Sequence, residues 1–338
     1  MNSPATSPLT RPSSGSTASP KVSVRTSATS LLEGLIGPVV TIVIASFVVF
    51  TALSFAPGDP VSQKLGARAT DVQRAALRAQ LGLDQPLPIR YWHWLVNAAH
   101  GDFGSSMVSG STVSELLAPR IATTIFLVVY AGILVLVVGF ALGTVGAMVR
   151  PLSSAVAALT GLAIAIPSYV AATLLVAVFS LSLGWFPVLG SGTGFADRLW
   201  HLTLPAIALA VGWSAFVTQI TAASLRQERL SDHVETALSR GIPPAQVFRR
   251  HILRNAAVPI VTTTGTLLAG LVAGSVVVET AFGLDGLGSL LVTGILSKDY
   301  NVVTAISLIL VVVFVISTAI VTAMQRTLDP RIREGVKP

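Results

Sequence analysis

Residues 121–149 read IATTIFLVVYAGILVLVVGFALGTVGAMV, and no Asp, Glu, Lys or Arg occurs between Arg120 and Arg150. A helix of about 20 apolar residues crosses the hydrocarbon core of a bilayer, and a charged side chain inside that core is costly. This stretch therefore predicts a membrane-spanning helix. It decides the fold class, because segments that cross a bilayer have to pair all their backbone polar groups internally.

The composition of the whole chain agrees with a membrane protein. Of its 338 residues, 52% are hydrophobic and 11% are Asp, Glu, Lys or Arg, whereas soluble domains carry about 25% of these charged residues. The mean hydropathy is +0.75. The sequence has no cysteine, which excludes disulfide frameworks, thiolate nucleophiles and Cys-based metal sites.

Six charge-free stretches each predict one helix. The ambiguous one is 151–196, because Gly184 and Pro187 mark a turn-rich second half; we expect one helix near 155–182 there, kinked at Pro167. The predicted fold is therefore all-α, with six transmembrane helices. The six stretches are 34–58, 121–149, 151–196, 199–225, 255–278 and 300–325.

Lys and Arg predict the orientation of these spans. With a cytoplasmic N-terminus, the internal segments hold fourteen of the 22 basic residues, and most of the others lie in the long external segment 57–120. Basic residues collect in cytoplasmic loops, and loops longer than about 60 residues weigh little in this rule. Both termini are therefore expected in the cytoplasm. The net charge of +7 is explained by this topology, without nucleic acid.

Four parts are expected along the chain. The Ser- and Thr-rich start lacks the apolar residues of a core and predicts a disordered cytoplasmic tail. The parts are the tail 1–33, the first span with its external segment 34–120, a five-helix core 121–326 that includes the cytoplasmic loop 226–256, and a C-terminal cytoplasmic tail 327–338.

The external segment carries its own helix signals. Thr70 and Gln73 form a capping-box pattern, which predicts a helix that runs to Leu81 and stops at Gly82. A second helix is predicted from Pro88. The segment is either a docking platform for a soluble partner or a cap over the helices, and the residues favour neither. Its aromatic residues, which suit the membrane interface, are Tyr91, Trp92 and Trp94.

Two pairs of glycines have the small-x-x-x-small spacing that lets helix backbones approach closely in lipid. They are Gly139 with Gly143 and Gly270 with Gly274. Because glycine is common in this apolar sequence, a chance match has equal weight.

The loop 226–256 predicts two short helices around a break. Asp232 is expected to cap the first helix, with Glu235 completing a capping box. Gly241 is expected to end that helix, and Pro244 to begin the next. The loop is either a docking element for a soluble cytoplasmic subunit or a solvated basic loop, with equal weight. The apolar residues expected to share one face are Val234, Ala237 and Leu238.

This loop resembles the EAA motif of ABC-importer permeases, whose skeleton is Glu-Ala-Ala, three residues and Gly. The chain has Glu235-Thr236-Ala237, three residues and Gly241, and Arg250-His251-Ile252-Leu253-Arg254-Asn255 is similar to a further element of the peptide-permease branch. Leu238 and Ser239 depart from that branch's usual Arg-Ala. The other stretches that resemble the family, in the same order, are Pro57–Pro60, Leu81–Asp84, Gly101–Gly104, Val277–Phe282, Gly286–Gly288 and Leu328–Arg333.

The resemblance implies a type I ABC-importer permease fold and the B-type subunit of a dipeptide or oligopeptide importer in the bacterial inner membrane. It implies a heterodimer with a C-type permease, two cytoplasmic ATPases that hold ATP and Mg, and an extracytoplasmic substrate-binding protein. The chain itself would hold no cofactor and would contact membrane lipid. The residues expected to couple it to an ATPase are Glu235, Thr236, Ala237, Leu238, Arg240, Gly241, Val247 and Phe248.

The sequence contains no recognisable catalytic constellation, so the chain is not expected to be an enzyme. None of its four Lys follows Gly, which excludes the Gly-Lys-Ser/Thr of a P-loop. The five His form no His-Glu-x-x-His pattern, so no metal site is expected. Ser191 lies in a Gly-rich turn without the pattern of a nucleophile elbow.

Five polar residues are candidates for lining a pathway. Glu279 lies at the end of a span, where an ionisable group is a functional candidate, although a position in interfacial water is favoured. The others are more often expected to hydrogen-bond their own or a neighbouring helix. The candidates are Ser168, Thr173, Gln219, Ser275 and Glu279.

A secondary transporter or channel is the main alternative. Ion-coupled carriers place ionisable residues at mid-membrane, and the six stretches contain no Asp, Glu, Lys or Arg. A membrane-embedded protease would need Ser and His on facing spans, and His201, at the edge of a span, is a poor candidate.

Overall fold

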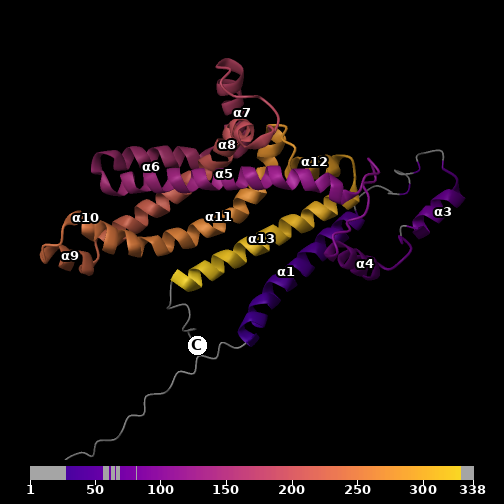
Figure 1. Cartoon of the computed structure of the whole chain (residues 1–338), viewed down its shortest axis with the longest axis horizontal. Helices are drawn as coiled ribbons and strands as arrows, with labels where there is room; N and C mark the ends of the chain where they lie inside the picture. The colour runs from indigo at the N-terminus through magenta and orange to yellow at the C-terminus, as the bar shows by residue number, and fades with distance from the viewer. Residues whose placement is uncertain (1–27, 56–60, 62–64, 66–68, 81, 329–338) are drawn as a thin grey trace, which may run out of the picture. The chain divides into compact units, whose positions relative to one another are not determined.

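The computed structural model describes residues 28–55, 61, 65, 69–80 and 82–328 (Figure 1). Within them the chain is helical apart from one isolated β-bridge, between Ser105 and Thr112, so the all-α prediction is confirmed. The chain divides after Gly37, and the packing contacts below lie among residues 38–328. The helices are α1 Ala28–Ser54, α3 Asp71–Gln80, α4 Leu87–Ala99, α5 Val113–Met148, α6 Arg150–Ala165, α7 Ser168–Leu175, the π-helical η1 Val176–Ser182, α8 Gly194–Arg229, α9 Asp232–Ser239, α10 Pro244–Val247, the π-helical η2 Phe248–Ile252, α11 Leu253–Ala281, α12 Leu287–Leu296 and α13 Tyr300–Leu328.

The predicted number of six spans is not confirmed. Among the described residues, four helices are long and apolar enough to cross a membrane, and a fifth span is present if the bent pair α6 and α7–η1 counts as one. The stretch 255–278, predicted as a span, lies within the 29-residue helix α11. The four helical spans are Ile36–Ser54, Val113–Met148, Gly194–Arg229 and Tyr300–Ala323.

The span predicted near 155–182 is broken rather than kinked. Helix α6 ends at Ala165, α7 begins at Ser168, and the two directions differ by 99°. Pro167 has no N–H to donate and disfavours a helical conformation in the residue before it. Ile166 is accordingly extended, with φ −84° and ψ 115°. The helix therefore stops and restarts at this proline.

The two ends of the chain differ from the predicted tails where they are described. Helix α1 begins at Ala28, inside the predicted tail 1–33. Helix α13 continues to Leu328, which is inside the predicted tail 327–338. Residues 1–27 and 329–338 lie outside the described residues, as do the Pro57–Pro60 stretch and Leu81.

The glycine pairs allow close helix packing, as their spacing predicts. A Cβ at Gly139 would lie 2.7 Å from the side chain of Val217, and one at Gly143 would lie 2.5 Å from Thr221. The backbones of α5 and α8 therefore approach too closely for any side chain at these positions. The second pair lies on α11, where Gly270 contacts Trp213 and Gly274 contacts Leu209, both on α8.

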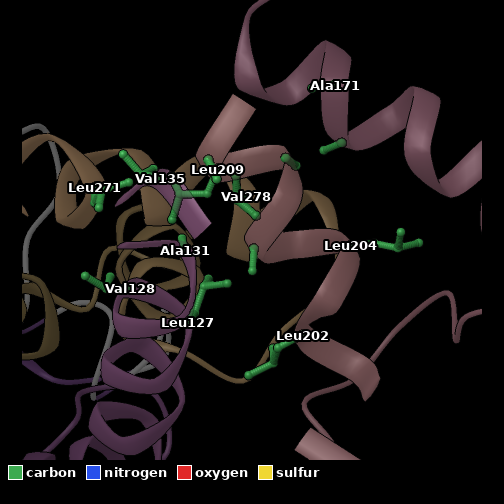
Figure 2. Close-up of a cluster of buried hydrophobic side chains, with 14 of the residues drawn as sticks. Leu127, Val128, Ala131, Val135, Ala171, Leu202, Leu204, Leu209, Leu271 and Val278 are labelled. Carbon is green, nitrogen blue, oxygen red and sulfur yellow. The ribbon is translucent and has the colours of Figure 1, made fainter. Parts of the chain in front are cut away.

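The largest apolar cluster joins α5, α7, α8 and α11. Figure 2 shows Leu127, Ala131 and Val135 following one another along α5, with Leu209 of α8 and Leu271 of α11 in the same cluster. These helices bury their contacting sides and leave other apolar side chains exposed to the surroundings, as expected for helices in lipid.

The external segment folds as its sequence signals predict. The backbone N–H of Thr70 donates to Gln73 Oε1 at 3.0 Å, and the N–H of Gln73 donates to Thr70 Oγ1 at 3.3 Å. Gly82 follows α3 with φ +64°. On α4, the buried Tyr91 hydroxyl lies 2.8 Å from Ser46 Oγ and donates to the Val43 carbonyl at 2.9 Å. Tyr91 therefore attaches α4 to α1, which agrees with a capping role for this helix.

We predict that Gly143→Ala destabilises the chain, because the new methyl group would collide with Thr221 and with the Thr218 carbonyl, 2.8 Å away. Overpacking of this kind costs about 1–3 kcal/mol. The measurement is the thermal unfolding midpoint of the purified chain in detergent. Gly161→Ala on α6 is the matched control, since nothing lies within 4 Å of its Cβ position. Equal midpoints for the two variants would contradict the close α5–α8 contact.

Candidate functional site

The loop between α8 and α11 forms two short helices, but its first cap differs from the prediction. Helix α9 begins at Asp232, so Ser231 occupies the N-cap position and Glu235 is the fourth helical residue. Ser231 Oγ donates to the Glu228 carbonyl at 2.6 Å and caps nothing in α9. The predicted Asp232–Glu235 capping box is therefore wrong, because the chain leaving α8 places Ser231 in the extended conformation that a cap requires.

The end of α9 is as predicted. Gly241 has φ +77°, a conformation that glycine adopts without steric cost. Its N–H donates to the Leu238 carbonyl at 2.9 Å, and the N–H of Ile242 donates to the Ala237 carbonyl at 3.2 Å. This pair of bonds is the Schellman motif. Pro244 then opens α10 as its first residue.

The eight residues predicted to couple the chain to an ATPase lie on different sides of the loop. Ala237 and Val247 are buried together with Val234 in an apolar cluster that includes Leu225 of α8 and Ile252 of η2. Phe248 is half-buried against the same cluster. The remaining five residues are exposed: Glu235, Thr236, Leu238, Arg240 and Gly241.

Leu238 does not share the buried face expected of it. Its side chain is 47% exposed, and that of Leu230, at the end of α8, is 85% exposed. Val234 and Ala237 are both buried. The loop therefore fixes one side to the helices and presents the other side, with its leucines, outward.

Two polar contacts hold the loop to the spans, and neither was among the predicted site residues. Arg226 Nη2 donates to the Gly146 carbonyl and to Ser153 Oγ, both at 2.7 Å. Asn255 Nδ2 donates to Glu228 Oε1 at 2.8 Å, and His233 Nε2 lies 2.8 Å from the same oxygen. These contacts join the end of α8 to the α5–α6 connection, to α9 and to α11. Asn255 is the last residue of the Arg250–Asn255 stretch that resembles the peptide-permease branch. That resemblance is the only sequence signal that points to these contacts.

Glu279 is buried, so the favoured expectation that it lies in interfacial water is wrong. The residue is 0% exposed. Thr124 Oγ1 donates to its Oε1 at 2.7 Å, and the N–H groups of Gly288 and Ser289 donate to its Oε2 at 2.7 and 3.3 Å. Both N–H groups belong to the first turn of α12, where a carboxylate satisfies unpaired donors and complements the helix dipole. Glu279 therefore ties α11 to α5 and α12.

Comparison with known families adds to this geometry. The model described as "Binding-protein-dependent transport system inner membrane component" matches residues 136–334. The model for the N-terminal part of such membrane components matches residues 29–128. The chain belongs to this family of binding-protein-dependent ABC-importer permeases.

Relatives of known name cover nearly the whole permease. The "Probable peptide ABC transporter permease protein y4tP" of Sinorhizobium fredii is 32% identical over 308 residues, which are 90% of this chain and 98% of that protein. The "Glutathione transport system permease protein GsiC" of Escherichia coli K12 is 34% identical over 307 residues, with the same shares. These matches support an importer permease and do not favour a secondary transporter or channel.

Solved importer structures have the same fold. The inward-facing MetNI methionine ABC transporter matches with a TM-score of 0.53 at 19% identity, over 63% of this chain and 96% of that chain. An amino acid ABC transporter with histidines matches with a TM-score of 0.52 at 18% identity, over 63% and 94%. The predicted importer-permease fold is therefore confirmed.

The predicted pathway candidates of the permease do not come together at one site. Glu279 and Ser275 are buried, and Ser275 donates to the Val272 carbonyl. Thr173 is exposed and donates to the Tyr169 carbonyl of its own helix, while Gln219 is exposed on α8. Ser168 lines a cavity of about 360 Å³ beside the α6–α7 break.

We predict that Glu279→Ala lowers the thermal unfolding midpoint of the purified permease, because it leaves the Thr124 hydroxyl and two α12 N–H groups without their acceptor. Leaving a buried donor unpaired costs about 1–3 kcal/mol. Asp285→Ala is the matched control, since this carboxylate lies on the connection that follows α11 and is exposed. A Glu279→Ala midpoint as high as that of Asp285→Ala would contradict the capping role.

Proposed function

We propose that this permease is the B-type membrane subunit of an importer for peptides or related small solutes such as glutathione. The observation that carries the proposal is the match over 90% of the chain to permeases named for peptide and glutathione transport. The family model for the N-terminal part covers the long external segment between α1 and α5. The chain is expected to hold no cofactor and to catalyse no reaction itself.

The partners follow from the same proposal. Membership of the family implies ATPase and substrate-binding components. We expect two cytoplasmic ATPases with ATP and Mg, a soluble binding protein on the outer side, and a related C-type permease that forms the other half of the pathway. The selectivity of the assembly would then depend largely on the binding protein.

Helix α9 is the proposed coupling helix. Its apolar side is buried against α8 and η2, and its outward side offers Glu235, Leu238 and Arg240. An apolar side chain exposed among charged ones suits a surface that a partner covers. Because Arg226 and Asn255 tie the loop to the ends of three helices, an ATPase that moves α9 would also move those helices.

Both termini are proposed to lie in the cytoplasm, with the loop 226–256 on the same side. The loop cluster contains Met148 from the end of α5, Leu225 from α8 and Leu253 from the start of α11. A second cluster contains Val113 from the start of α5 together with Leu287 and Val302. The span ends that are expected on one side of the membrane thus pack with each other. This supports a topology in which successive spans cross the membrane in opposite directions. The concentration of Lys and Arg supports the choice of side.

The pathway is proposed to pass the break between α6 and α7. Ser168 and Trp213 line the cavity there, and Gly270 leaves room for the Trp213 ring. These residues come from α7, α8 and α11. Together with α5, these helices form the largest apolar cluster.

We predict that Glu235→Arg and Gly241→Asp uncouple transport while the spans stay folded. The first reverses a charge on the outward side of α9, and the second adds a charge and strains the φ +77° position. A docking cost of about 1.4 kcal/mol would weaken the ATPase contact about tenfold. The measurements are peptide uptake and peptide-stimulated ATP hydrolysis by the whole importer in proteoliposomes.

The control for the two loop variants is Glu115→Arg, which makes the same charge change as Glu235→Arg. Glu115 is exposed in the first turn of α5, whereas the loop packs against the last turn of that helix. It is expected to keep normal uptake. Co-purification of the ATPases establishes assembly for each variant. Normal uptake by both loop variants in assembled importers would refute the coupling role of α9.

We further predict that ATP hydrolysis by the reconstituted importer rises when its own binding protein is added together with the transported ligand. The ligands to compare are a dipeptide, an oligopeptide and glutathione. Stimulation by none of these, with stimulation by a solute of another class, would refute the proposed substrate class and leave the permease assignment intact.

A further inference from the structure

A cavity of about 910 Å³ lies beside the external segment. Its walls come from the last turns of α1, from Arg78 of α3, from one side of α4, from the connections 82–85 and 102–107, and from the first turns of α13. The size is within the range of small-molecule sites, which are about 300–1,000 Å³. Neither the coupling loop nor the cavity at Ser168 is part of it.

The α4 wall of this cavity carries a guanidinium with which no carboxylate of the described chain forms an ion pair. Arg90 of α4 is half-buried and, among the described residues, its side chain forms no ion pair or hydrogen bond. Its guanidinium lies over the Phe50 ring, 5.9 Å from the centroid. Burial lowers the pKa of Arg90 below its ordinary value. A partly desolvated guanidinium is stabilised by a hydrogen-bonded anion.

Two further donors of the same cavity lack an acceptor. Trp94 Nε1 and the Tyr300 hydroxyl are buried, and neither has a hydrogen-bond partner within the described chain. Buried polar atoms are nearly always hydrogen-bonded. An indole N–H and a guanidinium can only donate. Each of the three side chains can donate to an acceptor oxygen, and the guanidinium is also stabilised by negative charge.

The position of the cavity indicates which anion this is. Phe50 and Leu53 belong to the last turns of the span Ile36–Ser54, and Tyr300 begins the span Tyr300–Ala323. The cavity thus lies where two spans end, at the depth of lipid headgroups. Trp and Tyr are enriched at this depth. The apolar side chains of α1 offer a surface for acyl chains, which a soluble anion would not use.

We propose that this cavity binds the headgroup of a phospholipid, with its phosphate held by Arg90, Trp94 and Tyr300 and its acyl chains lying along Phe50 and Leu53. The bound lipid would connect α1, α4 and α13. This site does not depend on which solute the importer carries. It depends only on the placement of these span ends at the membrane surface.

Two carboxylates at the exposed edge of the cavity indicate the type of headgroup. Asp84 and Asp102 both line it. Asp102 Oδ1 already accepts from the Gly104 N–H at 2.9 Å, which leaves Asp84 as the freer acceptor. An ammonium group beside the phosphate would pair with Asp84. A glycerol headgroup has no positive charge and would leave the carboxylate of Asp84 unpaired. Phosphatidylethanolamine is therefore the expected ligand, in preference to phosphatidylglycerol.

The test uses the full-length chain purified in detergent, with the thermal unfolding midpoint followed as lipid is added. Phosphatidylethanolamine is expected to raise the midpoint at lower concentration than phosphatidylglycerol. Arg90→Gln and Trp94→Phe are each expected to raise the half-maximal lipid concentration about tenfold, since each removes a hydrogen bond to a charged group. Asp84→Asn is expected to abolish the preference between the two lipids.

The matched control is Trp92→Phe, on the same helix but 62% exposed and outside the cavity lining. It is expected to respond to lipid like the unaltered chain. Trp94→Phe keeps the aromatic ring, so it tests the N–H even if Arg90→Gln fails to fold. Native mass spectrometry counts the lipids that each variant retains.

Several results would overturn the proposal. An unchanged lipid response in both Arg90→Gln and Trp94→Phe would exclude the phosphate site. If inorganic phosphate alone raised the thermal unfolding midpoint as much as the lipid does, the cavity would be a site for free anions. Displacement of the lipid by trialanine would make it a peptide site instead. None of these results bears on whether the importer carries peptides, which the uptake measurement decides separately.

Discussion

Helices in lipid gain little by hiding apolar surface from one another, so their association depends on close packing and on polar contacts. In this permease α5 packs closely on α8. Gly139 and Gly143 bring the α5 backbone against Val217 and Thr221, at distances that exclude even a methyl group. Both helices are 36 residues long. A single pair of glycines therefore sets the spacing of the two longest elements in the described chain.

The polar contacts at the two ends of this helix pair have different consequences. Near the start of α5, Thr124 of α5 and Glu279 of α11 bind the first turn of α12, and the donors around the carboxylate are satisfied by the chain itself. Near the end of α5, Arg226 and Asn255 hold the loop 226–256 on the side that faces the long helices. The cluster around Glu279 is therefore buried, whereas the loop keeps an exposed side that includes Leu238.

Much of this arrangement is predictable from the sequence, because many of the signals are local. Charge-free stretches mark the helices, the Thr70–Gln73 capping box forms as expected, and the glycine at 241 ends α9 in the left-handed conformation. The failures have tertiary causes. The burial of Glu279 depends on Thr124, which is 155 residues away in the chain. The cap of α9 depends on the path by which the chain leaves α8. Neither cause leaves a pattern within a short window of sequence.

The break at Pro167 was recognised from the sequence as a kink, and its severity bears on the pathway. Non-helical backbone at membrane depth is tolerated only where protein buries it or where it lines a water-filled cavity. Ile166 and Ser168, on either side of the break, both line the cavity beside Trp213. The two residues that flank Pro167 thus border the same space. This favours Ser168 over Thr173 and Gln219 as a pathway residue, because neither of those residues lines that cavity.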